Sequence, residues 1–378
     1  MDLSKKRGNG EGSIHRRKGG GWCAQYTVYT AKGRKRKTLY GKTRQEVATK
    51  LAKALSDQQG GLSFDAGNQT VGEYLARWLK DSVRDTVRQG TFERYEQIIR
   101  LHISPSLGSL KLKALSPVHI QHFYREKLDS GLSPATVQKI HAVLHKALDQ
   151  AVGWSLVPRN ATETVTAPRS APNEIQPLDS EQVKTLLEAA HGERFEGLYV
   201  LAIHTGLRQG ELLGLKWKDV DLESSLIRVR RTLTRNRGRL LLSEPKTKRS
   251  RRTVRLTEQA VHTLREHLAH QIEYMERLGD LYEDRGLVFA TEKGTLVNPS
   301  NLRKRSFAPL LSKAQLPRIR FHDLRHTCAT LLLARNVNPK IVSEMLGHAT
   351  IAITLDTYSH VLPNMQDSAT HALEDVLR

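Results

Sequence analysis

Three prolines within the stretch TAPRSAPNEIQPL, residues 166–178, constrain the fold of this chain more than any other feature. Proline lacks a backbone N–H and clashes with the preceding helical turn, so neither a helix nor a central strand continues through it. The chain has 378 residues, enough for two or three separate hydrophobic cores. We therefore predict an interdomain linker at residues 166–177, with a folded unit on each side of it.

The segment before the linker contains several amphipathic stretches with helix caps. Thr70 stands three residues before Glu73, the spacing of a capping box, and precedes VGEYLARWLKDSV with apolar residues at helical spacing. Ser133 and Pro134 suit the N-cap and first helical position of a later helix. TFERYEQIIRLHI and SPVHIQHFYREKL are further predicted helices. We predict an all-α bundle over residues 68–165.

The N-terminal segment is strongly basic and shows the pattern of strands. Residues 1–60 hold 15 Lys and Arg against 4 Asp and Glu, a net charge of +11. GWCAQYTVYT alternates as a strand does, AKG suits a turn, and RKRKTLYG suits a returning strand. We predict a small three-stranded sheet plus a helix over residues 1–62. A disordered basic tail is the alternative, which the alternating aromatic residues disfavour beyond residue 20.

The tripeptide Gly41-Lys42-Thr43 has the ending of a nucleotide-binding P-loop. That motif needs a glycine five residues before Gly41, where Arg36 stands instead. A capping box explains Thr43 better, because Glu46 follows it by three residues. The sequence therefore predicts a helix start here rather than a site for ATP.

The whole chain carries 60 Lys and Arg against 39 Asp and Glu, a net charge of +21 with an isoelectric point near 10.0. A polyanionic partner suits this excess, because each neutralised phosphate releases condensed counterions. Nucleic acid is the favoured partner. General basicity of the ribosomal type and attraction to acidic lipid are the alternatives.

The remaining bulk properties favour a reduced, non-membrane environment. The mean hydropathy is −0.48, and no apolar run approaches the length of a membrane span. MDLSKKRGNG lacks the apolar stretch of a secretory signal, so we expect a cytoplasmic protein without a membrane partner. The two cysteines, Cys23 and Cys328, lie far apart and indicate reduced thiols rather than a disulfide framework.

The unit at residues 178–378 is predicted to be mainly helical with a small antiparallel sheet. SEQVKTLLEAA, FEGLYVLAIHTG, QGELLGLKW and EQAVHTLREHLAHQIEYMERL have helical spacing. SLIRVRRTL and GRLLLSEPKTKRSRRTVRL interrupt these helices as short strands. We expect the strands to form one sheet.

The stretch RFHDLRHTCAT, residues 320–330, has two histidines four apart, as in the helix of a zinc protease. In that motif a Glu follows the first His, whereas Asp323 stands here. Arg325 would lie within one turn of the cation, which is unfavourable in a partly buried site. A metal bound by His322 and His326 is therefore the weaker hypothesis.

A phosphate-binding site suits the same stretch better. His322 and Arg325 are three residues apart and share a helical face. Arginine binds phosphate bidentately and keeps its proton, so two arginines can neutralise the charge of phosphoryl transfer without a metal. Arg208 is a second candidate, with Glu211 three residues on to orient it. A surface or structural ion pair is the alternative for either arginine alone.

The segment EMLGHATIAITLDTYSHV closely resembles the nucleophile region of the tyrosine recombinase (phage integrase) family. The resemblance extends over about 150 residues in the family's order, and Tyr358 follows Arg325 by 33 positions. The matched residues are Arg208 in TGLRQGELLGLKW, Lys246 in EPKTKRSRRTV, His322 and Arg325 in HDLRHT, His348 in LGH, and Tyr358 in DTYSH.

The resemblance implies a catalytic role for each matched residue. Tyr358 resembles the nucleophile that attacks the scissile phosphate and leaves a 3′-phosphotyrosyl DNA with a free 5′-hydroxyl. Arg208 and Arg325 would hold the non-bridging oxygens. Because the covalent link conserves the energy of the broken bond, the reaction implied needs no ATP. The resemblance also implies no metal or other cofactor, since the two arginines take the place of a metal ion.

The remaining matched residues would handle protons. His322 and His348 would hydrogen-bond the phosphate or manage the tyrosine proton, and one sequence does not divide these duties. Lys246 resembles the general acid for the departing 5′-oxygen. Lys248, two residues on, is the competing candidate.

The resemblance also implies domain roles and partners. Residues 68–165 resemble a helical core-binding (SAM-like) domain, and residues 1–62 resemble the arm-type DNA-binding domain of lambda-like integrases. The catalytic domain would be residues 178–378. The implied partners are double-stranded DNA with core and arm-type attachment sites, a homotetramer on synapsed DNA, a host DNA-bending protein and an excisionase or directionality factor. The tail QDSATHALEDVLR either docks on a neighbouring subunit or forms a solvated helix.

We therefore expect a site-specific recombinase that integrates a phage or mobile element and acts at the nucleoid of a bacterial host. A chromosome or plasmid dimer resolvase, a type IB topoisomerase-like enzyme and a conjugative-transposon integrase are alternatives of similar chemistry. Resolvases usually lack the basic N-terminal module. A DNA-binding architectural protein without catalysis is the alternative from another class, and such a protein has no need of Tyr358.

Overall fold

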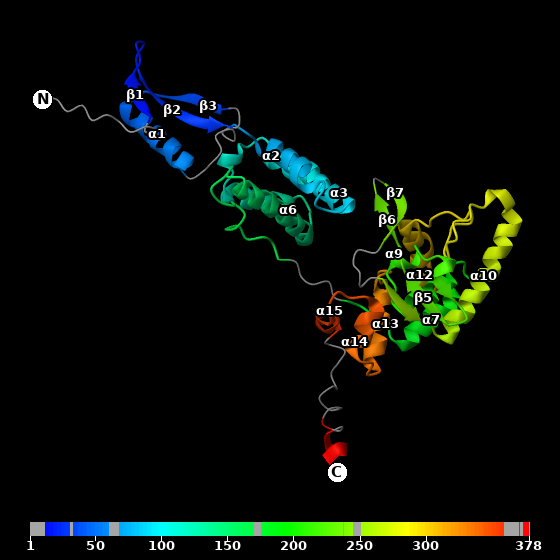
Figure 1. Cartoon of the computed structure of the whole chain (residues 1–378). Helices are drawn as coiled ribbons and strands as arrows, with labels where there is room; N and C mark the ends of the chain where they lie inside the picture. The colour runs from blue at the N-terminus through cyan, green and yellow to red at the C-terminus, as the bar shows by residue number, and fades with distance from the viewer. Residues whose placement is uncertain are drawn as a thin grey trace. The chain divides into compact units, whose positions relative to one another are not determined.

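The computed structural model describes residues 12–30, 33–59, 68–169, 175–236, 238–244, 251–358, 370 and 373–377 (Figure 1). The chain divides into two compact units, Met1–Pro172 and Asn173–Arg378. Most of the described residues in regular structure are helical, and the strands form small antiparallel sheets. Among the described residues, no helix is both long enough and apolar enough to span a membrane.

The first unit begins with a three-stranded antiparallel sheet. Strands β1 (Ser13–Arg16), β2 (Trp22–Thr30) and β3 (Gly33–Gly41) lie in the order β1-β2-β3, and helix α1 (Arg44–Gln59) packs on the sheet. The alternation of apolar residues along β2 turns Ala24 and Val28 towards Val47 of α1, and together they form a small core.

The predicted N-cap of α1 is confirmed, whereas the reciprocal contact expected of a capping box is shifted by one residue. The Thr43 hydroxyl accepts a hydrogen bond from the Glu46 backbone N–H at 3.1 Å. The Glu46 carboxylate accepts one from the backbone N–H of Lys42 at 2.9 Å. Thr43 thus has the helix-starting contact that its spacing from Glu46 predicts.

The helical part of this unit contains five α-helices with π-helical continuations. Its predicted caps are confirmed, because the Thr70 hydroxyl and the Glu73 carboxylate accept reciprocal backbone hydrogen bonds at 3.2 and 2.8 Å. Ser133 accepts from the backbone N–H of Thr136 at 3.3 Å, with Pro134 at the first helical position. The elements are α2 (Val71–Trp78), η2 (Leu79–Val83), α3 (Gln89–Ile98), η3 (Ile99–Ile103), α4 (Ser104–Leu107), η4 (Leu112–Ala114), α5 (Pro117–Asp129) and α6 (Pro134–Gly153).

The second unit is built around helix α8 (Glu196–Thr205). Its sequence EGLYVLAIHT is apolar on nearly every side, and all but its first and ninth residues are buried. Helices α10 (Glu258–Leu278) and α13 (Asp323–Ala334) both contact it. The other helical elements are α7 (Ser180–Ala190), α9 (Gln209–Leu212), η5 (Trp217–Asp219), η7 (Gly279–Leu281), α11 (Pro299–Leu302), η8 (Arg303–Phe307), α12 (Ala308–Lys313), α14 (Pro339–Leu346) and α15 (Ile351–Tyr358).

The strands in the described part of this unit form two sheets, so the prediction of one sheet is wrong. Strands β4 (Val220–Asp221), β5 (Leu226–Val229) and β8 (Arg252–Arg255) form one sheet in the order β4-β5-β8. Strands β6 (Thr232–Asn236) and β7 (Arg239–Ser243) form a separate hairpin.

The physical cause of this separation lies between β5 and β6. Arg231, which stands between the two strands, forms an ion pair with buried Asp219. Strand β6 then packs on the turn around α9, where a Cβ at Gly210 would lie 2.6 Å from the Thr232 hydroxyl. Glycine at this position therefore permits the close approach that separates β6 from the first sheet.

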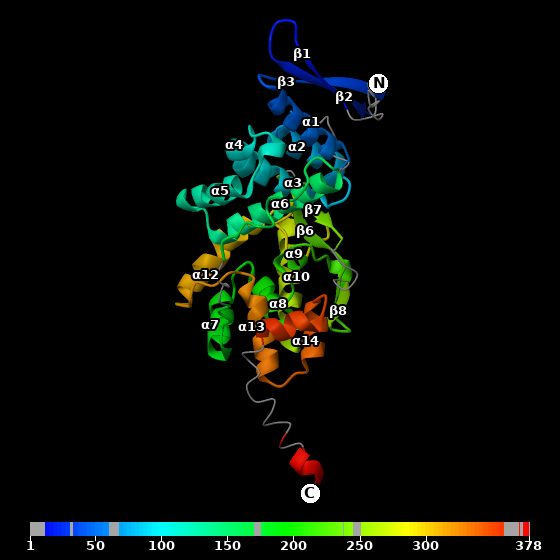
Figure 2. The same cartoon turned by 90° about the vertical axis from the view of Figure 1, so that its left-hand side faces the viewer.

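Helices α13, α14 and α15 lie together at one end of the second unit (Figures 1 and 2). Ala329 and Leu333 of α13, Val342 and Leu346 of α14, and Tyr358 of α15 form a common apolar cluster. This packing brings the last residue of α15 next to α13.

Candidate active site

Arg208 lies at the turn between α8 and α9. Helix α8 ends at Gly206, whose φ of 60° is left-handed, and a Cβ there would lie 2.4 Å from Leu346 Cδ2. Glycine therefore permits both the turn and the contact with α14. The Arg208 guanidinium donates to the Glu211 carboxylate at 2.9 Å and to the backbone oxygen of Gly347 at 3.2 Å. About a third of this side chain, 37%, remains exposed.

Arg325 is the most deeply buried cation of the site, with 3% of its surface exposed. Its Nη1 donates to the backbone oxygens of Gly206 and Leu346, each at 2.8 Å. Its Nη2 is buried and has no hydrogen-bond partner among the described residues. Burial, followed by the charges of Arg208 and Arg252, lowers the pKa of Arg325 to about 9. The group remains a cation at neutral pH with one donor atom unsatisfied.

Glu211 is a buried carboxylate shared by two arginines. Arg252 of β8 donates to it through both terminal nitrogens, at 3.2 and 3.0 Å, while Arg208 donates from the other side. Burial raises the pKa of this carboxyl, but the charge and hydrogen bonds of Arg252 and Arg208 lower it overall. Arg252 also donates from Nε to the Met345 backbone oxygen at 2.5 Å. Glu211 and Arg252 thus connect α9, β8 and α14.

His348 follows the left-handed turn that ends α14. Gly347 adopts a φ of 70°, and the backbone N–H of His348 donates to Ser343 at 3.0 Å. The His348 Nδ1 lies 2.7 Å from the hydroxyl of Thr354, a fully buried residue of α15. Burial, then the charges of Arg325 and Arg208, lowers the pKa of His348 to about 4. The imidazole is therefore neutral at neutral pH.

Tyr358 ends α15 and is 1% exposed. Its hydroxyl lies 2.7 Å from Nδ1 of His326 in α13. Burial raises the pKa of this phenol to about 12, although the Arg325 charge opposes the rise. The hydroxyl is therefore protonated at neutral pH.

The two histidines of RFHDLRHTCAT have different surroundings. His322 is the N-cap residue of α13 and is exposed, and its ring stands edge-on to that of His326 with 4.9 Å between centroids. Partial desolvation and then the Arg325 charge lower the pKa of His322. Desolvation and then His322 lower that of His326 to about 4. Among the residues that the structure describes, no three His, Cys, Asp or Glu side chains form a possible metal-ligand group.

Five of the six residues predicted for the site lie in the described part of the chain, and hydrogen bonds, ring contacts or charge effects connect them: Arg208, His322, Arg325, His348 and Tyr358. Lys246 and its competitor Lys248 lie outside the described residues.

Three further residues of this site were not predicted. Arg252 stood among five basic residues of one run, and no local signal separates it from its neighbours. The Thr354 contact joins residues six apart across a loop, and the His326 contact with Tyr358 joins residues 32 apart. Neither contact has a sequence signature.

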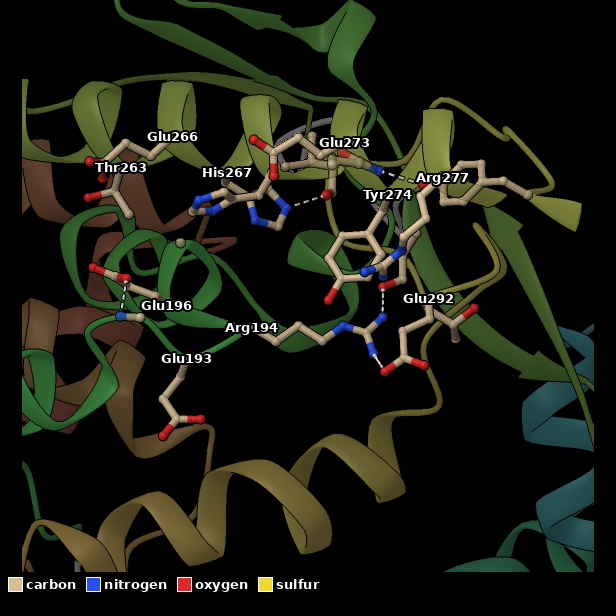
Figure 3. Close-up of a pocket in the computed structure, with 18 of the residues that line it drawn as sticks. Glu193, Arg194, Glu196, Thr263, Glu266, His267, Glu273, Tyr274, Arg277 and Glu292 are labelled. Atoms are coloured by element: carbon tan, nitrogen blue, oxygen red, sulfur yellow. Dashed lines mark hydrogen bonds and ion pairs between the residues drawn. The ribbon is translucent and has the colours of Figure 1, made fainter. Parts of the chain in front are cut away.

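A hollow in the second unit lies away from these residues. It has a volume of about 850 Å³ and lies between the start of α8 and the face of α10 (Figure 3). None of the predicted site residues lines it. Its charged side chains largely pair with one another or with nearby groups, such as Arg194 with Glu292 at 2.8 Å and Glu193 with Lys313 at 2.8 Å. The predicted site residues therefore lie outside this hollow.

Comparison with known proteins identifies the family. The model of the phage integrase family matches residues 176–365, half of the chain. A tyrosine recombinase XerC-like protein of Caldanaerobacter subterraneus is 35% identical over 360 residues, which cover 90% of this chain and 92% of the relative. The chain belongs to the phage integrase family. It is a tyrosine recombinase, and members of this family are DNA strand-transferring enzymes.

Other similarities extend over most of this recombinase. A model of the SAM-like N-terminal domain of phage integrases matches residues 70–128. An integrase of Streptomyces ambofaciens is 31% identical, with 97% of each chain covered. The Tn1549 transposon integrase, solved in complex with a circular intermediate DNA, superposes with a TM-score of 0.69 at 23% identity, covering 82% of this chain and all of that one. The structural likeness shows that the chain has the tyrosine recombinase fold.

Removing Arg252 is expected to destabilise this recombinase strongly. The Arg252 and Glu211 side chains are 7% and 4% exposed, so Arg252→Met leaves a buried carboxylate short of one partner. We expect the free energy of unfolding to fall by about 3–5 kcal/mol, measured by urea denaturation of the full chain. Lys340→Met is the matched control, because its pair with Glu344 is 64% and 66% exposed, and we expect a loss below about 1 kcal/mol. Equal losses would contradict the structural role of the buried network.

His348 is expected to make stability depend on pH. Its pKa in the fold is about 4, below the ordinary value of 6.5, so folding favours the neutral ring. This contribution is complete above about pH 6.5 and is lost as pH falls towards 4. The melting temperature should therefore fall less between pH 7 and pH 5 in His348→Asn than in the unchanged chain. If the melting temperatures of both proteins fall equally between pH 7 and pH 5, His348 contributes nothing to the pH dependence of stability.

Proposed function

We propose that this recombinase cleaves and rejoins DNA through a 3′-phosphotyrosyl intermediate on Tyr358. The observation that carries this proposal is the convergence of Arg208 and Arg325 on the C-terminal end of α14, where Nη2 of Arg325 is buried and unpaired among the described residues. The Arg325 charge also acts on the Tyr358 phenol. A phosphate oxygen is the acceptor that would satisfy this nitrogen. Arg208, anchored by Glu211, would hold a second oxygen of the same phosphate.

The two arginines would supply the charge stabilisation of the reaction. In phosphoryl transfer, negative charge spreads over the equatorial oxygens of the transition state. Arg325 is held by two carbonyl groups and Arg208 by a carboxylate, so neither guanidinium needs to reorganise when that charge develops. The positive charge that a metal ion provides in other phosphoryl-transfer enzymes would come from these side chains.

Proton transfers on both sides of the phosphorus would complete each cleavage. The Tyr358 oxygen forms a bond to phosphorus while the bond to the 5′-oxygen breaks, and the phenol loses its proton in the same step. Lys246 would protonate the departing 5′-oxygen, with Lys248 as the alternative acid. His322 and His348 would hydrogen-bond the phosphate. Religation reverses these steps, and no ATP or other cofactor is required because the phosphotyrosyl bond conserves the energy.

The domains would divide the DNA contacts. Residues 68–165 would form the core-binding domain, and their similarity to the SAM-like domain of phage integrases supports this role. Residues 1–62 would form an arm-type DNA-binding domain. An exposed basic run on β3, Arg34, Lys35 and Arg36, supports this role. The active assembly would be a homotetramer on two synapsed duplexes, with the C-terminal tail as a subunit contact.

Integration of a phage or mobile element is the favoured biological reaction. The ICEBs1 integrase of Bacillus subtilis is 27% identical over 88% of this chain, and the integrase of Mycobacterium phage D29 is 28% identical over 74%. A host DNA-bending protein and an excisionase would assist the reaction at the nucleoid of a bacterial host. Resolution of chromosome or plasmid dimers is the second candidate, which the XerC-like relative favours.

Trapping of the covalent intermediate tests the proposal. A core site is first selected from random duplexes by its binding to Tyr358→Phe. The selected duplex is then nicked beside the cleavage position, so that cleavage releases the short strand with the 5′-hydroxyl and religation cannot follow. The unchanged chain should form a covalent adduct that EDTA does not prevent, and Tyr358→Phe should bind the duplex without forming one. An adduct with Tyr358→Phe would refute the nucleophile, and loss of the adduct in EDTA would refute the metal-free reaction.

Deletion of residues 1–62 tests the arm-type domain. The truncated chain should cleave the selected core duplex at nearly the normal rate, because the core-binding and catalytic domains remain. Its recombination of full attachment sites should fall by at least about tenfold, because contacts with phosphates at the arm sites are lost. Equal losses in the two assays would contradict an arm-binding role.

A further inference from the structure

The hydroxyl of the proposed nucleophile already has a hydrogen-bond partner. Tyr358 is almost completely buried, and its oxygen lies 2.7 Å from Nδ1 of His326. The ring of His326 is tilted by 56° against that of Tyr358, with 5.7 Å between centroids, so the two rings meet through their polar atoms rather than by stacking. No other side-chain acceptor bonds this hydroxyl among the described residues.

The other nearby groups are less suited to receive the phenolic proton. The Nδ1 of His348 is engaged with the Thr354 hydroxyl at 2.7 Å. His322 is in edge contact with His326, not with the tyrosine. Arg325 is a cation and offers no acceptor. His326 is therefore the one imidazole of the three that directly contacts the nucleophilic atom.

We propose that His326 is the catalytic base that takes the proton of Tyr358 during DNA cleavage. This inference rests on the proposed role of Tyr358 as the nucleophile. The phenol donates to Nδ1, and the neutral His326 ring carries its hydrogen on Nε2. As the bond from Tyr358 to phosphorus forms and the bond to the 5′-oxygen breaks, the phenolic proton moves to Nδ1 and His326 becomes an imidazolium.

The surroundings of His326 suit a base that is neutral before DNA binds. Burial and the adjacent His322, Arg320 and Arg325 disfavour its charged form, while Asp323 favours it. Its pKa of about 4 is low for a base acting at neutral pH. A bound phosphate brings negative charge into the same site, and an anion beside an imidazole raises its pKa. His326 thus becomes more basic when the DNA is in place, and on religation the imidazolium returns its proton to the tyrosine.

The variant His326→Asn separates proton transfer from hydrogen bonding. The amide oxygen of asparagine lies close to the position of Nδ1, so it accepts a hydrogen bond but does not hold a proton. We expect His326→Asn to bind the selected duplex normally and to cleave it about 100- to 10,000-fold more slowly near neutral pH in single-turnover assays. Its rate should rise about tenfold per pH unit from pH 7 to pH 9, because the fraction of ionised tyrosine rises in that way. The rate of the unchanged chain should rise less steeply.

A fluorinated tyrosine at position 358 provides the second measurement. Fluorine makes the phenol more acidic, so cleavage depends less on a base. Fluorotyrosine should therefore increase the cleavage rate of His326→Asn at least about tenfold more than it increases the rate of the chain with His326 intact. A normal rate for His326→Asn would overturn the proposal. A loss that is constant with pH and is not reduced by fluorination would also overturn it, because His326 would then have a structural role.

The controls distinguish this inference from the proposed function. Tyr358→Phe should form no adduct in either background. If it does form one, the nucleophile is wrong and the base is wrong with it. If Tyr358→Phe is inactive while His326→Asn cleaves normally, the nucleophile stands and the base alone is refuted.

Discussion

The buried carboxylate of Glu211 is the interaction on which the site depends. It accepts hydrogen bonds from Arg252 of β8 and from Arg208 at the start of α9, and both arginines also donate to carbonyl groups at the end of α14. A buried charge is stable only when it is paired and hydrogen-bonded, so these partners fix one another's positions. The loop that follows α14 carries His348. One carboxylate therefore fixes the relative positions of an arginine proposed to bind phosphate and a histidine proposed to be catalytic.

A third, more deeply buried arginine, Arg325, lies beside the framework around Glu211. Burying a guanidinium beside two other arginines is unfavourable, and the lowered pKa of about 9 expresses that cost. Two backbone oxygens offset part of it, while Nη2 is left without a partner among the described residues. An incoming phosphate would relieve both the repulsion and the unpaired donor. The positive charge and the unpaired donor are therefore in place before an anion binds. Such preorganisation is what a phosphoryl-transfer site requires.

Much of this arrangement was predictable from local sequence, and the failures share a cause. Thr70 and Ser133 cap helices as predicted, because a cap depends on residues within one turn. The order of five residues predicted that they share one site, because the family signature lies in short motifs: Arg208, His322, Arg325, His348 and Tyr358. The contact of His326 with Tyr358 and that of Arg252 with Glu211 depend on the packing of distant elements, which no local spacing records. The division of the strands into two sheets likewise depends on long-range contacts of Asp219 and Gly210.

The most direct test of the preorganised arginine site is a crystal structure of Tyr358→Phe bound to the selected duplex. We predict that Nη1 of Arg325 keeps its hydrogen bonds to Gly206 and Leu346 while Nη2 donates to the scissile phosphate. Arg208 should contact the same phosphate and retain its bond to Glu211. A scissile phosphate that lies away from Arg325, or an Arg325 that leaves both carbonyl groups to reach it, would contradict a site assembled before the DNA arrives.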